Sequence, residues 1–432
     1  MVNTQRDFYR GAVQSIRDGL IAGTETIRDL HTSILDSLAA VGVQSTINQL
    51  ITKQVYRIIS CMSARIGGLL DTVLFHIPIP GGELAPTENQ RLLVSSINGA
   101  FGDWLHHNHR TWAQPMEICR EGNTLKLHPD CLQAALPNAK PHLILLIHGL
   151  CLNDSHWSPR RQMGFAEAWE TRGNCTTLTL RYNSGLHIHT NGQQLAHLMQ
   201  QLVDAYPRSL QRITIVGHSM GGLVARSACS YADQQEFGWV TQLQELACLG
   251  SPHEGAALER IGHWVTQTLG KTSLTASLGR AGQARSAGIQ DLRYASLRHE
   301  DWQDDPTHAD TPTHLTVVPL LPHVRYCLLA SNWKIGMAET VGDGLVQVSS
   351  ARGFSLQDQA LGDDHTATDQ ATLVHTPPVH TPHPDHDIDV YRPLLQGIHH
   401  MALTRHPLVY RELTIWLFGD LMQEQTDETF HA

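Results

Sequence analysis

One serine in the sequence, Ser219, lies in a motif typical of a catalytic nucleophile. The segment Gly217-His218-Ser219-Met220-Gly221-Gly222 follows an apolar stretch at 212–216 and precedes good helix formers from Leu223 onward. A serine on a tight turn between a strand and a helix is a nucleophile elbow, and glycines flank it because larger side chains would clash. The pattern therefore predicts that Ser219 attacks an acyl carbon.

A serine nucleophile needs a base and an acid that orients the base, and after such an elbow the acid precedes the histidine in the chain. Asp343 lies between two glycines after an apolar stretch at 326–330, which predicts a loop carboxylate beyond a strand. The base is expected in Gly397-Ile398-His399-His400, where the residues leave His399 and His400 both open. Other acids compete with Asp343 in this part of the chain: Asp363, Asp364, Asp387 and Asp389.

Two backbone N–H groups would stabilise the oxyanion that such an attack creates. One belongs to Met220, the residue after the nucleophile. The other is expected at Leu150, because His148-Gly149-Leu150 directly follows the apolar stretch 142–147.

The elements around these residues alternate between short apolar strands and helices. Strands are expected at 142–147, 177–182, 212–216, 246–249 and 326–330, with a helix at 193–206 and a β-hairpin at 116–127. This order predicts an α/β fold with a mostly parallel central sheet covered on both faces.

Residues 1–110 instead repeat apolar residues at spacings of three and four, which predicts helices at 27–41 and 47–73 and a shorter one at 93–104. We therefore expect an N-terminal helical extension or cap at 1–110 and a catalytic domain at 111–432. Residues 255–310 are expected to form a lid or a fixed connecting segment. Residues 355–387 are rich in His and Pro and are expected to form a solvated loop rather than a metal site, although four histidines lie there: His375, His380, His383 and His386.

Composition limits the partners and the compartment. The formal net charge is −10, which argues against a nucleic-acid surface because that needs clustered positive charge. The N-terminus has no apolar signal core, and no uncharged apolar run reaches the roughly 18 residues of a membrane span. We therefore expect a cytoplasmic protein. The eight cysteines are scattered, which is typical of reduced thiols.

These motifs together resemble bacterial α/β-hydrolase esterases and lipases, including the branch related to GPI inositol-deacylases, over about residues 115–420. The segments that carry the resemblance are His148-Gly149-Leu150, Gly217–Gly222, Gly250–Gly255, Gly342-Asp343-Gly344-Leu345-Val346 and His400-Met401-Ala402-Leu403. The resemblance implies an α/β-hydrolase fold with Ser219 as nucleophile, Asp343 as acid and His400 as base, with His399 as the runner-up. It implies no cofactor and no metal, and Met401-Ala402 after His400 gives no reason to carry over a calcium site.

The expected function is a serine hydrolase that cleaves carboxylic esters, lipase- or esterase-like, through an acyl-enzyme, and the expected substrate is a lipid-like acyl ester. Two alternatives stay open: an acyltransferase on the same fold, and a non-catalytic hydrolase-fold binding protein. The N-terminal helices are expected to brace the core, and contact with a membrane or lipid surface through them is the alternative. The sequence sets no oligomeric state.

Overall fold

The computed structural model describes residues 4–15, 17–18, 85–157, 164–257, 260–262, 286–302, 312, 315–334, 342–353 and 388–419. The described residues fall into two compact units. The first holds those up to 94 together with 104–114, and the second holds 95–103 together with those from 115 onward. The predicted division at residue 110 stays a prediction.

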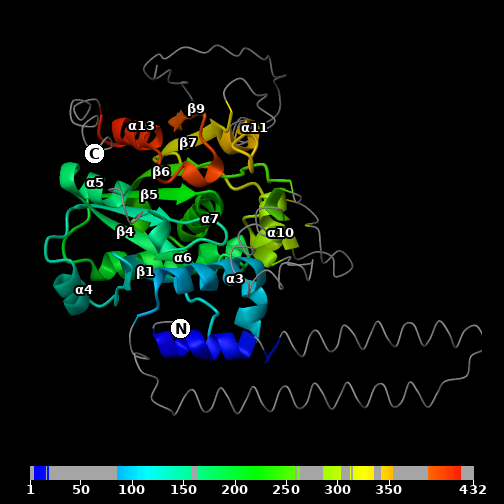
Figure 1. Ribbon diagram of the computed structural model, residues 1–432. Helices are drawn as coiled ribbons and strands as arrows, with labels where there is room; N and C mark the ends of the chain where they lie inside the picture. Colours follow the sequence, from blue (N-terminus) through cyan, green and yellow to red (C-terminus); the bar gives the residue numbers. More distant parts are fainter. Residues whose placement is uncertain are drawn as a thin grey trace, which may run out of the picture. The chain divides into compact units, whose positions relative to one another are not determined.

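In the described part of the second unit, a nine-stranded sheet runs in the order β2-β1-β4-β3-β5-β6-β7-β8, with β9 paired to β7 (Figure 1). Pairing is parallel from β4 to β8 and antiparallel at β1 and β2. The strands are β1 (Glu117–Arg120), β2 (Asn123–Thr124), β3 (His142–Ile147), β4 (Cys175–Arg181), β5 (Arg212–His218), β6 (Leu243–Leu249), β7 (Arg325–Asn332), β8 (Val390–Tyr391) and β9 (Leu394–Gln396). The predicted α/β fold with a mostly parallel sheet is confirmed.

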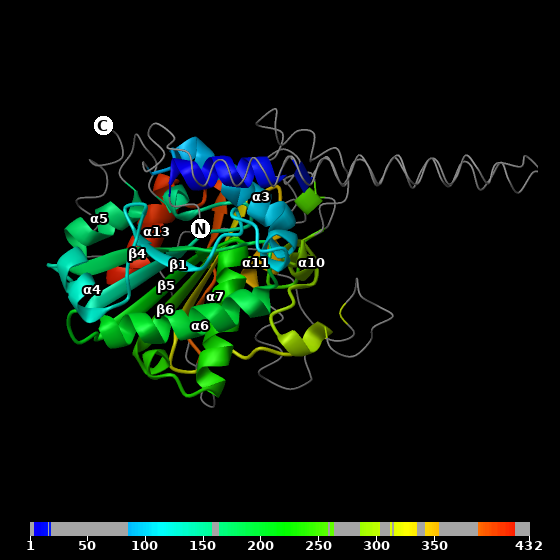
Figure 2. The ribbon, with the colours of Figure 1, turned by 90° about the horizontal axis from the view of Figure 1, so that it is seen from below.

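Helices cover both faces of the sheet, as the fully buried strands β3 and β4 require. Helices α6 and α7 pack together on one face, and α5 and α13 cover the other (Figures 1 and 2). The helices of this unit are α4 (Pro129–Ala135), α5 (Phe165–Arg172), α6 (Ile188–Ala205), α7 (Met220–Gln234), α10 (Ala287–Tyr294), α11 (Val348–Arg352) and α13 (Pro407–Phe418). Short 3-10 turns are η1 (Asp154–Trp157), η2 (Gly238–Gln242), η3 (His299–Trp302) and η4 (His400–Ala402).

A cluster of buried aromatic side chains holds α5 and α13 together. Phe165 and Trp169 of α5 pack against Tyr410 of α13, with ring centroids 5.4 and 6.1 Å apart. The Trp169 indole also donates a hydrogen bond to Thr414 Oγ1 at 2.9 Å, so the one polar atom of this buried ring is satisfied. These contacts fix α13 against the sheet just after the chain leaves His400.

The first unit contains helical residues 5–15 and the ends of α3 (Glu88–His107). Thr87 and Gln90 form a capping box that starts α3, which confirms a helix over 93–104 and extends it at both ends. Gly11 lies against Trp112, and the Trp112 indole donates to the Phe8 carbonyl at 3.1 Å. The helices predicted at 27–41 and 47–73 lie outside the described residues.

Candidate active site

Ser219 sits on a strained turn between β5 and α7. Its φ of 55° and ψ of −123° are rare for a residue with a side chain, and such strain typically costs about 1–3 kcal/mol. The Ser219 N–H donates to the Leu249 carbonyl of β6 at 2.9 Å and holds the turn against the neighbouring strand. The flanking glycines are needed because a Cβ on Gly217 would lie 2.4 Å from Gly222 N, and one on Gly221 would lie 2.5 Å from the Ile147 carbonyl.

Asp343 lies in a turn after β7 that presents its carboxylate inward. Gly342 and Gly344 on either side have φ of 58° and 97°, so the turn uses the left-handed region twice. Asp343 Oδ1 accepts from Leu345 N at 3.0 Å and from Val346 N at 2.8 Å. The other oxygen, Oδ2, is thereby directed to His400 Nδ1 at 2.7 Å.

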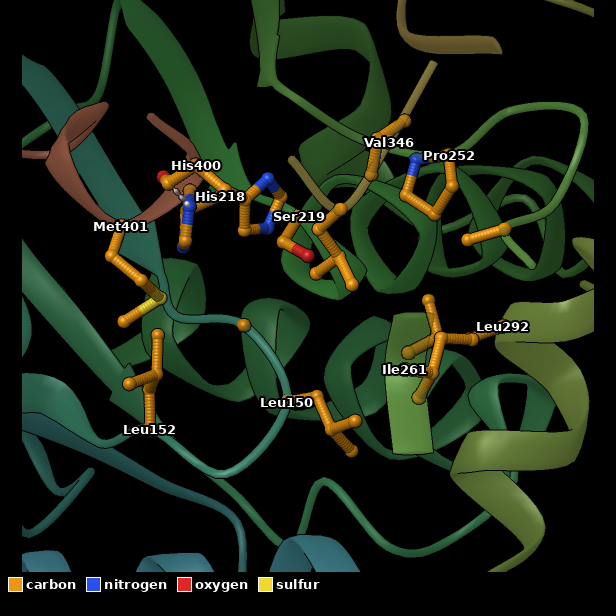
Figure 3. Close-up of a pocket in the computed structure, with 13 residues that line it drawn as sticks. Leu150, Leu152, His218, Ser219, Pro252, Ile261, Leu292, Val346, His400 and Met401 are labelled. Carbon is orange, nitrogen blue, oxygen red and sulfur yellow. Dashed lines mark hydrogen bonds between the residues drawn. The ribbon is translucent and has the colours of Figure 1, made fainter. Parts of the chain in front are cut away.

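His400 opens the turn η4 after β9. Its backbone N–H donates to the Asp343 carbonyl at 3.1 Å, so the histidine is tied to the acid loop by main chain as well as by side chain. The ring of His400 lies beside the Ser219 side chain, and both residues line one pocket (Figure 3). The described contacts of Ser219 do not include a hydrogen bond to this ring, and such bonds are often long before substrate binds.

The structure therefore brings Ser219, Asp343 and His400 together. The alternative base His399 and the competing acid Asp389 do not take part in this arrangement. In the described contacts, the side-chain hydrogen bond to Asp343 is made by His400 and not by His399, whose pKa is lowered by burial and then by Arg405. Asp389 pairs with Arg325 at 3.2 Å near the surface. The other competing acids, at 363, 364 and 387, lie outside the described residues, as do all four histidines of the 355–387 loop.

The predicted oxyanion donors flank the nucleophile from two sides. Met220 is the first residue of α7, so its N–H has no acceptor within the helix. Leu150 follows Gly149, whose added Cβ would lie 3.0 Å from the Ser219 Cβ, so glycine permits the close approach of this loop. In the described part of the chain, neither Leu150 nor Met220 N–H donates a hydrogen bond, which leaves both available to a ligand.

His148 holds the oxyanion loop in place, a role that the sequence did not reveal. Its Nδ1–H donates to the Gly149 carbonyl at 2.8 Å, its Nε2 accepts from Tyr182 N at 3.4 Å, and its ring stacks on Tyr182 at 4.4 Å. Burial lowers the pKa of His148 to about 4, so the ring is neutral at pH 7 and can serve as donor and acceptor at once.

His218 is a second functional residue that the sequence analysis missed, although it stands inside the elbow motif. Its Nε2–H donates to the His400 carbonyl at 3.0 Å, and the two rings lie 4.8 Å apart. Burial, followed by the neighbouring His400, lowers the His218 pKa well below its ordinary value. His218 is therefore a neutral brace that fixes the main chain of His400.

The pocket beside Ser219 is mostly apolar and small. Its free volume is about 10 Å³, room for roughly one water molecule. The lining residues are Gly149, Leu150, Leu152, His218, Ser219, Pro252, Ala256, Ile261, Leu292, Leu345, Val346, His400 and Met401. Ile261 and Leu292, on the side away from His400, come from the segment predicted as lid or connection (Figure 3).

The described residues hold no group of three or more His, Cys, Asp or Glu side chains arranged to bind a metal ion. The same residues include no helix that is both long and apolar enough to cross a membrane.

The site can now be compared with known proteins. Residues 137–297, which include the oxyanion loop and the elbow, match a family model described as "Putative serine esterase (DUF676)". The predicted resemblance to serine esterases is confirmed. The match supports a lipase- or esterase-like hydrolase. No curated protein matches the chain.

Solved structures similar to this chain include three microbial lipases and esterases. The mature lipase BlEst2 of Bacillus licheniformis is 17% identical, covers 71% of this chain and 97% of its own, and has a TM-score of 0.34. The Pyrococcus furiosus esterase Pf2001 is 13% identical, with 66% and 82% covered and a TM-score of 0.36. A lipase-esterase related protein from Clostridium acetobutylicum is 10% identical, with 70% and 100% covered and a TM-score of 0.37. The strand order and the elbow define the fold without these matches.

Proposed function

We propose that the protein is a serine carboxylic-ester hydrolase that works through Ser219, His400 and Asp343. The observation that carries the proposal is the 2.7 Å hydrogen bond from His400 Nδ1 to Asp343 Oδ2, beside a serine on a strained elbow in the same pocket. A binding protein has no use for a nucleophile, a base and an acid assembled in this order.

In the proposed reaction, Nε2 of His400 takes the Ser219 proton while Oγ attacks the ester carbonyl. Asp343 accepts from Nδ1–H, which keeps Nε2 free as the base, and stabilises the imidazolium that forms. The Leu150 and Met220 N–H groups stabilise the oxyanion, by about 3 kcal/mol per donor. The imidazolium protonates the departing alkoxide, and water then cleaves the acyl-enzyme by the same sequence of proton transfers.

The apolar lining of the pocket favours the acyl side of the substrate. Leucine, isoleucine, valine and methionine side chains gain free energy by covering an acyl chain, at about 25 cal/mol per Å². This supports acyl esters, including lipid-like ones, as the substrate class.

A fluorophosphonate probe tests the proposal without knowledge of the substrate, because it reacts with activated serines. We expect one adduct on Ser219 in the full chain, none in Ser219→Ala, and an undiminished adduct in the control Ser155→Ala, whose serine lies on η1 and does not line the pocket. If the wild type forms no adduct either with or without detergent, the proposed hydrolase is contradicted and the alternative, a non-catalytic binding protein, is retained.

An acyltransferase would give the same adduct. Product analysis with an added alcohol separates the two reactions, because a hydrolase releases mainly the free acid and an acyltransferase releases mainly a new ester.

A further inference from the structure

A strained residue directly follows the proposed oxyanion donor Leu150. Cys151 has a φ of 59°, a left-handed value that glycine or asparagine more often takes. It stands third in a turn that Leu152 N closes on the Gly149 carbonyl at 3.3 Å. Such a conformation costs about 1–3 kcal/mol and persists only where the surrounding structure holds it. Contacts from outside this loop must therefore fix Cys151.

Ser184, in the loop that follows β4, supplies one of these contacts. Its Oγ accepts from Cys151 N at 3.0 Å, and both residues are almost fully buried. If this acceptor were removed, the buried N–H would lose a hydrogen bond, which typically costs about 1–3 kcal/mol. The bond therefore joins the loop after β4 firmly to the loop that carries Leu150.

The direction of the Leu150 N–H follows from the peptide units on its two sides. The Gly149 carbonyl and the Leu150 N–H belong to one planar unit, and His148 Nδ1 holds that carbonyl at 2.8 Å. The next unit ends in the Cys151 N–H, which Ser184 holds. Because both units are held, the φ and ψ of Leu150 have little freedom, and its N–H keeps one direction.

Helix α3 closes the other side of Cys151. A Cβ on Gly99 would lie 2.2 Å from Cys151 Sγ and 2.8 Å from Cys151 N, so the helix backbone is in direct contact with this turn. Asn183, in the loop after β4, donates through Nδ2 to the Gly102 carbonyl of α3 at 2.9 Å. Residues 95–103 of α3 belong to the same compact unit as both loops. Cys151 is therefore enclosed between α3 and the loop after β4.

We infer that Ser184 is a positioning residue that acts through Cys151 on the Leu150 N–H, with Gly99 of α3 as the support on the opposite side. The inference rests on the proposed function, because only a reaction that passes through an oxyanion uses this N–H. Among the described residues, Ser184 is not one that lines the pocket of Ser219. Its effect should appear in the transition state, where negative charge develops on the carbonyl oxygen, and not in the binding of the ester.

Ser184→Ala tests this role in the full-length protein with nitrophenyl butyrate as substrate. We expect kcat to fall about tenfold with KM within twofold of the wild type, a smaller loss than the roughly 10²–10³-fold that follows complete removal of an oxyanion donor. The pKa of the base in the pH profile of kcat/KM should stay unchanged, because the bond between His400 and Asp343 is not altered. Ser227→Ala is the matched control and should change none of these values: Ser227 is equally buried, donates to the Leu297 carbonyl at 2.7 Å and does not line the pocket.

Trifluoromethyl propyl ketone, which has the frame of a butyrate ester, measures stabilisation of the oxyanion itself. Ser219 Oγ adds to its carbonyl carbon, the carbonyl oxygen takes the negative charge, and His400 takes the serine proton. We expect its inhibition constant to rise about tenfold in Ser184→Ala, or about 1.4 kcal/mol, in proportion to the loss of kcat. Gly99→Ala, which brings a Cβ against Cys151, should act in the same direction, and it carries the same test if Ser184→Ala does not fold.

Two kinetic results would overturn the inference. The first is a folded Ser184→Ala variant whose kcat and inhibition constant both stay within twofold of the wild type. The second is a loss of kcat with an unchanged inhibition constant, or with a shifted pKa of the base, because either would indicate a general loosening of the site and not a misplaced Leu150 N–H.

Amide hydrogen exchange at Cys151 separates this inference from the proposed function. Exchange should be about tenfold faster in Ser184→Ala than in the wild type and unchanged in Ser227→Ala. Unchanged exchange in Ser184→Ala overturns the inference whatever the activity, and it retains the hydrolase if the wild type cleaves the ester. If the wild type neither cleaves the ester nor binds the ketone, the proposed function is overturned together with the role of Ser184 in the reaction.

Discussion

Replacing Asp343 by Asn changes one atom and should nearly abolish turnover. Oδ1 of Asp343 accepts from two backbone N–H groups, those of Leu345 and Val346, at 3.0 and 2.8 Å. An asparagine must place its own oxygen there, because its NH₂ group can only donate. The NH₂ group then faces His400 Nδ1, which has to accept.

The consequence is the wrong histidine tautomer. With Nδ1 as acceptor, the His400 proton moves to Nε2, which can no longer take the proton of Ser219. A change of this kind typically lowers kcat about 10⁴-fold, or about 5 kcal/mol of transition-state stabilisation. The fold should persist, because both backbone donors keep an acceptor.

The assay is the initial rate on a chromogenic butyrate ester, with the thermal midpoint measured on the same samples. Asp389→Asn is the matched control, because it is the same replacement at an aspartate that pairs with Arg325 outside the site. Turnover of Asp343→Asn within tenfold of the wild type, at an unchanged thermal midpoint, would refute this reasoning. A comparable loss in Asp389→Asn would show that the effect is not specific to the site.

Three further results are expected. Gly217→Ala should fail to fold or lose several degrees of thermal midpoint, because its Cβ would lie 2.4 Å from Gly222 N. In the control Gly238→Ala, the nearest atom to the new Cβ is 3.9 Å away, so this variant should fold normally. Equal thermal midpoints for the two variants would contradict the elbow geometry. Burial, and then Arg212, lowers the pKa of His142 to about 3, so its contribution to the free energy of unfolding is complete above pH 6.5 and is lost as pH falls from 6.5 toward 3. Between these pH values, the free energy of unfolding of His142→Asn, measured with urea, should depend on pH less steeply than that of the wild type, by up to about 1.4 kcal/mol per pH unit. An unchanged slope would contradict a neutral buried ring. Leu292→Ala should move the preferred acyl chain to longer esters in a chain-length series by enlarging a space of about 10 Å³, and an unchanged preference would place the acyl chain elsewhere.

Local sequence patterns predicted the strands because each is a short apolar run between polar turns. The run at 142–147 matches β3 at both ends. The run at 246–249 ends with β6 but missed its first three residues, where Gln244 is exposed. The run at 326–330 missed half-buried Arg325 at the start of β7 and the last two residues of that strand. Strand β9 was not predicted; it pairs with β7, and the carbonyl of Pro393 just before it accepts from Ala330 N at 3.0 Å.

Contacts between distant residues were beyond the sequence. With 28 histidines in the chain, nothing local distinguishes His148 and His218, which are buried and neutral, from those on the surface. The choice between His399 and His400 likewise depends on which ring meets Asp343.

The loops that carry Ser219, Asp343 and His400 are each fastened to a neighbouring strand or loop. Ser219 N donates to the Leu249 carbonyl of β6, the Asp343 carbonyl accepts from His400 N, and Gly397 N donates to the Asn332 carbonyl at the end of β7. Two residues opposite His400 in the pocket, Ile261 and Leu292, lie instead between β6 and β7. In the proposed hydrolase, part of the acyl selectivity thus comes from a different stretch of chain than the chemistry, so a relative's β6–β7 segment could be grafted here to change the substrate while the reaction stays the same.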